Sequence, residues 1–136
     1  YVDTGKVRFI FREFPLDDLA SGASMLARCV GKDDTSKSYD LTGILFDKQE
    51  DWAFVRGNPV PKLFEIAKQA GFTQDSFDKC LTDQKLLEQI TNIRERASKT
   101  FGVNSTPTFF VNGKRLNDAP TVENFDKLIE PLLKAG

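Results

Sequence analysis

The sequence predicts an α/β domain in which a long helical insertion interrupts a layered core. Three observations predict this class. Val7–Phe14 alternates between an apolar face and a partly apolar face, as a strand does. Between Asp17 and Thr100, apolar residues recur at three- and four-residue intervals, as in helices. The β-prone run Thr108–Val111 then precedes Asn112-Gly113, a dipeptide typical of two-residue hairpin turns. An order of strand, helices, two strands and helix suits a layered α/β domain.

The first helix is predicted directly after the first strand. Asp17 or Asp18 can cap its start, and the apolar spacing continues to about Val30, with Gly31 as its terminator. The next stretch, Lys32–Ser38, is polar, charged and without apolar periodicity. It is therefore predicted to be an exposed loop.

Two further helices are predicted in the middle of the insertion. One contains Leu41 and Trp52 and ends before Gly57, and we expect Trp52 to be a core anchor. The next has Pro61 inside its first turn and Gly71 just past its end, which is the usual placement of these two residues.

The remaining helices each begin at a residue that can act as an N-terminal cap. Thr73 begins a short helix, and Asp83 caps a longer one that ends at Gly102. Thr121 caps the last helix, in which Pro131 removes one backbone hydrogen bond.

Composition describes an ordinary soluble globular chain and excludes several classes of function. The 136 residues are 40% hydrophobic and 29% charged, which suits one domain with its own core. The formal charge is -1, so no net field favours nucleic acid or anionic lipid, and no nucleic-acid partner is expected. No apolar run is long enough to suggest membrane insertion. There is no histidine, which excludes histidine bases and histidine metal ligands.

The two cysteines, Cys29 and Cys80, are too far apart in sequence for a redox Cys-x-x-Cys or a zinc-ligand pair. They can form a disulfide whose loop of about 50 residues would stabilise the fold by roughly 4 kcal/mol on the chain-entropy model. They can equally be reduced, buried thiols, since each follows an apolar residue by three positions. The residues alone leave both alternatives open. Neither cysteine lies at a helix N-terminus with a basic neighbour, so no nucleophilic role is expected.

One stretch carries a family resemblance. Gly102-Val103, followed by Thr-Pro-Thr-Phe-Phe-Val-Asn-Gly at 106–113, resembles the cis-proline loop and hairpin of thioredoxin-fold proteins, in particular the DsbA-like disulfide oxidoreductases. Leu45–Ala53 and Arg12–Leu16 are also similar to bacterial members of that family. The resemblance covers the whole chain, but the family's first strand and its Cys-x-x-Cys helix have no counterpart here. Since the sequence opens on Tyr1 rather than methionine, we expect a processed or trimmed product.

The resemblance implies a thioredoxin-like fold with a helical insertion, missing the first β-α unit. Residues 1–16 together with 100–136 would form the thioredoxin-fold portion, and residues 17–99 the helical insertion. In that fold another strand lies between the strand at Val7 and the strand at Thr108. Because unpaired buried backbone is costly, we expect a sheet that is incomplete, rearranged or filled by another chain.

The resemblance also implies which residues form a site. Taken alone, the Thr106-Pro107 bond would be trans, since only about 5% of X-Pro bonds in folded proteins are cis. The family motif implies a cis bond there, and a role for Thr106 and Pro107 in binding an extended client peptide. It favours a structural disulfide between Cys29 and Cys80, as an oxidising compartment permits. No catalytic residue, metal ligand or cofactor is expected in these residues.

The expected function is a portion of a DsbA-like protein disulfide oxidoreductase, with the redox Cys-x-x-Cys absent from this chain. Its partners would be client proteins or peptides with thiols or disulfides, together with a membrane redox partner protein. Its location would be the periplasm or another extracytoplasmic compartment of a bacterium. Two alternatives are a non-catalytic thioredoxin-fold module that binds peptides and a protein like the kappa-class glutathione transferases.

Overall fold

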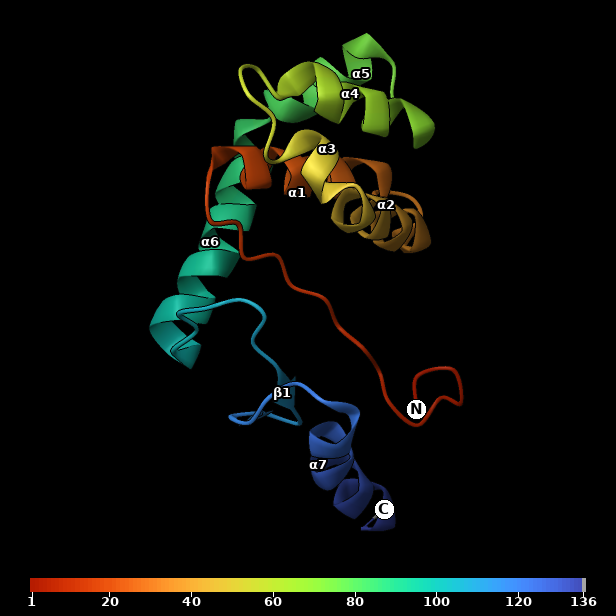
Figure 1. Ribbon diagram of the computed structural model, residues 1–136, viewed down its shortest axis with the longest axis vertical. Coiled ribbons are helices and arrows are strands. Elements are labelled where there is room, and N and C mark those ends of the chain that lie inside the picture. The colour runs from red at the N-terminus through yellow and green to blue at the C-terminus, as the bar shows by residue number, and fades with distance from the viewer. Residues whose placement is uncertain (136) are drawn as a thin grey trace. The chain divides into compact units, whose positions relative to one another are not determined.

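The computed structural model describes residues 1–135, which divide into two compact units (Figure 1). One unit, Glu13–Arg96, is helical. The other combines Tyr1–Arg12 with the chain from Ala97 onward and contains the small sheet. The division after Arg96 falls inside one long helix, α6 (Gln84–Phe101). The predicted α/β class is confirmed. The predicted division into a thioredoxin-fold portion (residues 1–16 with 100–136) and a helical insertion (residues 17–99) stays a prediction.

Capping side chains explain where the helices of the helical unit begin. The Asp17 carboxylate accepts the Ala20 N–H at 2.7 Å, and Asp83 accepts the Leu86 N–H at 3.0 Å. At Thr73 the cap is reciprocal with Ser76, as in a capping box. These starts agree with the sequence prediction. The helices of this unit are α1 (Asp18–Val30), α2 (Thr35–Asp47), α3 (Gln49–Trp52), α4 (Val60–Gln69), α5 (Gln74–Leu81) and the first part of α6.

The core of the helical unit lies where these helices meet. Helix α1 packs against α2 and α5, and α4 packs against α2, α3 and α5. Trp52 is only 6% exposed and its indole N–H donates to the Leu45 carbonyl at 2.9 Å, so its predicted role as a core anchor is confirmed. Burying each large apolar side chain contributes about 1.5–3 kcal/mol. The most deeply buried are Leu26, Leu41, Leu63, Phe77 and Ile90.

The region after α1 differs from the sequence prediction. The prediction of an exposed loop at Lys32–Ser38 is wrong from Thr35 onward, because α2 begins there. Asp34 caps it by accepting the Ser36 N–H at 3.0 Å and the Ser36 hydroxyl at 2.7 Å. These bonds hold the pKa of the Asp34 carboxyl below its usual value. The cap at Asp34 therefore starts a helix in a stretch that has no apolar periodicity.

The helix predicted from Leu41 to Trp52 is divided in two. Helix α2 ends at Asp47 and α3 begins at Gln49, with Lys48 between them. The Lys48 N–H still donates to the Ile44 carbonyl at 3.0 Å, so α2 closes with an ordinary last turn.

The second unit contains a hairpin and a C-terminal helix. β1 (Phe110–Val111) and β2 (Lys114–Arg115) are antiparallel and pair through Phe110↔Arg115 and Val111↔Lys114. Asn112 and Gly113 both have positive φ, 44° and 82°, which a type I′ turn requires. The predicted hairpin is confirmed. Helix α7 (Val122–Lys134) follows, capped as predicted by Thr121.

The strands are shorter than the sequence predicts. Within the described residues, the predicted strand Val7–Phe14 is neither helix nor strand, and only Phe110–Val111 of Thr108–Val111 is a strand. The alternating pattern was present, but a strand also needs a hydrogen-bonded neighbour. Among residues 1–135, β1 has a partner on one side only, which is β2. The incomplete sheet is thus the outcome found within this part of the chain.

Candidate functional site

The candidate loop begins where α6 ends. Gly102 has a φ of 63°, a left-handed conformation that glycine adopts easily and that is common just after a helix. Its N–H donates to the Ser98 carbonyl at 3.2 Å, and the next N–H, of Val103, donates to the Ala97 carbonyl at 3.0 Å. Val103 is buried. The loop therefore leaves the helix in a fixed direction.

Thr106 and Pro107, the residues predicted from the family motif, lie at the exposed part of this loop. The peptide bond between them is cis. The Thr108 hydroxyl donates to the Ser105 carbonyl at 2.6 Å and closes the turn around them. Within residues 1–135, neither the N–H nor the carbonyl of Thr106 has a hydrogen-bond partner. Both groups are therefore available to another molecule.

The hairpin holds the loop at its other end. The Leu116 N–H donates to the Phe109 carbonyl at 2.9 Å and extends the pairing of the two strands. The guanidinium of Arg115 donates through Nη1 to the Gly102 carbonyl at 3.1 Å, which joins β2 to the start of the loop. Sequence reasoning missed this role of Arg115. Its partner is a backbone carbonyl, which no sequence pattern marks.

Two aromatic pairs position β1. The Phe109 ring packs edge-on against Phe125 of α7, with 5.0 Å between centroids. Phe110, the first residue of β1, packs against Phe101 of α6 with 6.2 Å between ring centroids. Phe101 and Phe110 are 50% and 41% exposed, so an apolar surface remains open beside the loop.

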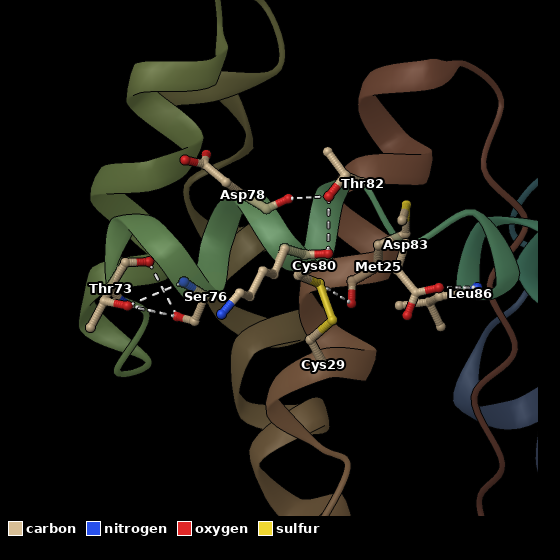
Figure 2. The surroundings of a disulfide bond; sticks show 10 residues. Met25, Cys29, Thr73, Ser76, Asp78, Cys80, Thr82, Asp83 and Leu86 are labelled. Carbon is tan, nitrogen blue, oxygen red and sulfur yellow. Dashed lines mark hydrogen bonds between the residues drawn. A yellow bond between two sulfur atoms is a disulfide. The ribbon is translucent and has the colours of Figure 1, made fainter.

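A second feature lies in the helical unit, where a disulfide joins Cys29 of α1 to Cys80 of α5 (Figure 2). The Sγ–Sγ distance is 2.04 Å and the cysteines are 51 positions apart. Cys80 is buried, whereas Cys29 is partly exposed. The Cys80 sulfur also lies 3.3 Å from the Met25 carbonyl oxygen. The two cysteines are thus paired, which is one of the two alternatives that the residues alone left open.

The four predicted site residues therefore form two separate groups in two units. Thr106 and Pro107 are adjacent in the loop, and Cys29 and Cys80 are bonded to each other. In the described part of the chain, no group of three or more acidic, cysteine or histidine side chains is arranged to hold a metal ion. The loop can present backbone hydrogen-bonding groups, and the disulfide can cross-link helices.

None of the helices in the described residues has the length and apolar character needed to cross a membrane.

Known proteins resemble this chain in sequence and in fold. The family model described as thioredoxin matches residues 1–131, and the chain accordingly belongs to the thioredoxin family. In solved structures, it matches alpha-DsbA1 of Wolbachia pipientis with a TM-score of 0.85 and 25% identity, covering 99% of this chain and 72% of that one. The predicted resemblance to DsbA-like proteins is confirmed.

Relatives among curated proteins carry a related name. A provisionally named protein-disulfide oxidoreductase of Rickettsia typhi is 29% identical, over 98% of this chain and 48% of its own. A protein of Rickettsia bellii with the same provisional name is 35% identical, over 83% of this chain and 42% of its own. The chain thus spans about half the length of the curated relatives it matches.

Proposed function

We propose that this chain is the client-binding and helical portion of a DsbA-like protein disulfide oxidoreductase. The observation that carries the proposal is the exposed Thr106–Pro107 loop, whose Thr106 backbone groups have no partner among residues 1–135. Family membership and the names of the relatives support exchange of thiols and disulfides as the activity.

In this function the loop would bind its client by strand addition. An extended peptide beside Thr106 can donate an N–H to its carbonyl and accept its N–H, as in other cases of backbone pairing. Each such bond contributes about 0.5–1.5 kcal/mol. The open apolar surface at Phe101 and Phe110 adds contact area for side chains on one face of the peptide. Binding would therefore depend on an extended backbone rather than on a particular client sequence.

The exchange step itself needs a thiolate of low pKa, which typically lies at a helix N-terminus. Cys29 and Cys80 are bonded to each other, and the 136 residues contain no Cys-x-x-Cys. We assign the redox pair to residues other than these 136. The partners would be proteins or peptides with thiols or disulfides and a membrane protein that renews the redox pair. A structural disulfide supports a bacterial extracytoplasmic location, because such bonds persist in oxidising compartments.

Client binding can be tested with the chain itself. Isotope-labelled protein is titrated with an extended cysteine-containing peptide, and amide chemical shifts are followed. Shifts should concentrate at residues 105–108 and be lost in Thr106→Pro, which removes the N–H. Thr106→Val keeps the N–H and should still bind. Binding that survives Thr106→Pro, or shifts confined to the helical unit, would contradict the proposed role of the loop.

Exchange is tested separately by insulin reduction. The 136-residue chain should be inactive, whereas the complete gene product should be active and lose its activity on alkylation. A complete product that binds peptide without reducing insulin would instead be a non-catalytic module. Specific binding of glutathione would favour the alternative related to kappa-class transferases.

A further inference from the structure

Each cysteine of the disulfide lies in the last turn of its helix. Cys29 is the next-to-last residue of α1, and Cys80 is the next-to-last residue of α5. The C-terminal end of a helix carries a partial negative charge, which disfavours an anion there. Thiol–disulfide exchange proceeds through thiolates. Opening this bond therefore releases a thiolate in a place that destabilises it.

The cations next to the cysteines in sequence do not offset this effect, because each has a carboxylate partner. Arg28 forms an ion pair with Glu13 at 2.6 Å, and Lys79 forms one with Asp75 at 2.8 Å. The first pair is half-buried, whereas the second is exposed and weak. Basic neighbours lower a cysteine pKa most when their charge is not neutralised by a closer acid.

The two cysteines differ in how far they are exposed to solvent. Cys80 is 4% exposed, and its Sγ lies 3.3 Å from the Met25 carbonyl oxygen. Figure 2 draws this contact as a dashed line. A thiolate that attacked Cys80 would have to enter a site that is almost closed to solvent. Cys29 is partly exposed and lies near the end of α1. Attack at Cys29 does not require the incoming group to enter that site.

We propose that Cys29 is the electrophilic sulfur of this bond, at which small thiolates form a mixed disulfide while Cys80 is the leaving group. The lone pair of the incoming thiolate forms the new S–S bond to Cys29. The Cys29–Cys80 bond breaks, and its electron pair leaves on Cys80. Solvent then supplies a proton, and the Cys80 thiol donates a hydrogen bond to the Met25 carbonyl, 3.3 Å away.

A second thiolate completes the reduction by displacing Cys29 from the mixed disulfide. Two equivalents of the small thiol are oxidised to their disulfide, and the two cysteines are reduced. This inference does not rest on the proposed function. It concerns the bond in the helical unit and not the redox pair, which the proposed function assigns to other residues.

The test maps the first adduct on the folded, disulfide-bonded protein. The protein is treated briefly with reduced glutathione and quenched in acid. Free thiols are then labelled with maleimide, and the digested peptides are identified by mass. Glutathione should be found on Cys29 and maleimide on Cys80, with at least roughly ten-fold preference over the reverse pattern. After denaturation in guanidinium chloride, the preference should fall to about two-fold or less, because the environments become alike.

Three outcomes would overturn the proposal. They are equal adducts on both cysteines of the folded protein, a preference for Cys80, and no adduct on the folded protein when the denatured protein reacts. A second measurement uses Cys29→Ser and Cys80→Ser, each first checked for native circular dichroism. The Cys29 thiol left in Cys80→Ser should react with oxidised glutathione roughly ten-fold faster than the Cys80 thiol left in Cys29→Ser.

Discussion

The guanidinium of Arg28 donates to both carboxylate oxygens of Glu13, with Nε–Oε1 at 2.6 Å and Nη2–Oε2 at 2.7 Å. The hydrogen bond to Glu13 raises the pKa of Arg28 above its ordinary value. Arg94 donates to the Pro15 carbonyl at 3.2 Å in the same segment. The residues that precede α1 are therefore attached to the helical unit at two points.

Glu13→Gln should lower the free energy of unfolding by about 1–2 kcal/mol, because it leaves a half-buried guanidinium without its charged partner. The Arg28 and Glu13 side chains are 29% and 12% exposed, so the loss should lie between those of surface and fully buried pairs. Urea denaturation measures it. Glu123→Gln breaks an exposed i,i+4 pair with Lys127 and is the matched control, with an expected loss below about 0.5 kcal/mol. Equal losses in both variants would contradict this account.

Removal of the disulfide should destabilise the helical unit by about 4 kcal/mol, since the bond closes a long loop in the unfolded chain. The variant Cys29→Ala/Cys80→Ala should show this loss in a urea titration. The wild-type protein should lose a similar amount when fully reduced. A loss below about 1 kcal/mol in both cases would mean that α1 and α5 are held together almost entirely by packing.

Replacing either of two glycines of the helical unit by alanine should change the free energy of unfolding, in opposite directions for the two positions. A Cβ at Gly31 would lie 2.4 Å from the Ser38 Cβ, so Gly31→Ala forces backbone movement and should cost about 1–3 kcal/mol. Gly43 lies in α2 with nothing within 4 Å of its Cβ position. Gly43→Ala should therefore stabilise the helix by about 0.5–1 kcal/mol. Thermal unfolding of the two variants checks the signs, and a stabilising Gly31→Ala would be inconsistent with the close approach.

The phenol of Tyr1 should ionise at a higher pH than an ordinary tyrosine. A hydrogen bond to Asp126 is the main cause that raises the pKa of Tyr1 from 10.0 to about 12. Because the folded-state pKa is raised, the contribution to stability is complete below the unfolded value and is lost as pH rises through about 12. Ultraviolet titration of Tyr39→Phe isolates Tyr1, the other tyrosine of the two. Adding Asp126→Asn should return the pKa toward 10.0, and an unchanged titration would exclude the hydrogen bond as the cause.

Most helices could be predicted from the sequence because their signals are local. Asp17, Thr73, Asp83 and Thr121 cap helices at the positions that their residue type favours. The hairpin at Asn112-Gly113 was predictable for the same reason. The strand at Val7–Phe14 was not, because a strand depends on a neighbour that no local pattern guarantees.

The site could be predicted only in part. The family motif predicted a binding site at Thr106 and Pro107, which stays a prediction. It also favoured the disulfide, although the spacing of the two cysteines left their pairing open. Arg115 and the pair of Arg28 with Glu13 were not found. Their partners are distant in sequence, and long-range polar contacts leave no periodic signal.

The buried indole of Trp52 makes the helical unit optically distinct. It is the sole tryptophan of the sequence and it lies within Glu13–Arg96. Fluorescence excited at the red edge of indole absorption will therefore report on the helical unit alone. Far-ultraviolet circular dichroism follows both units together. If the two units melt at different temperatures, the two signals will separate without any introduced label.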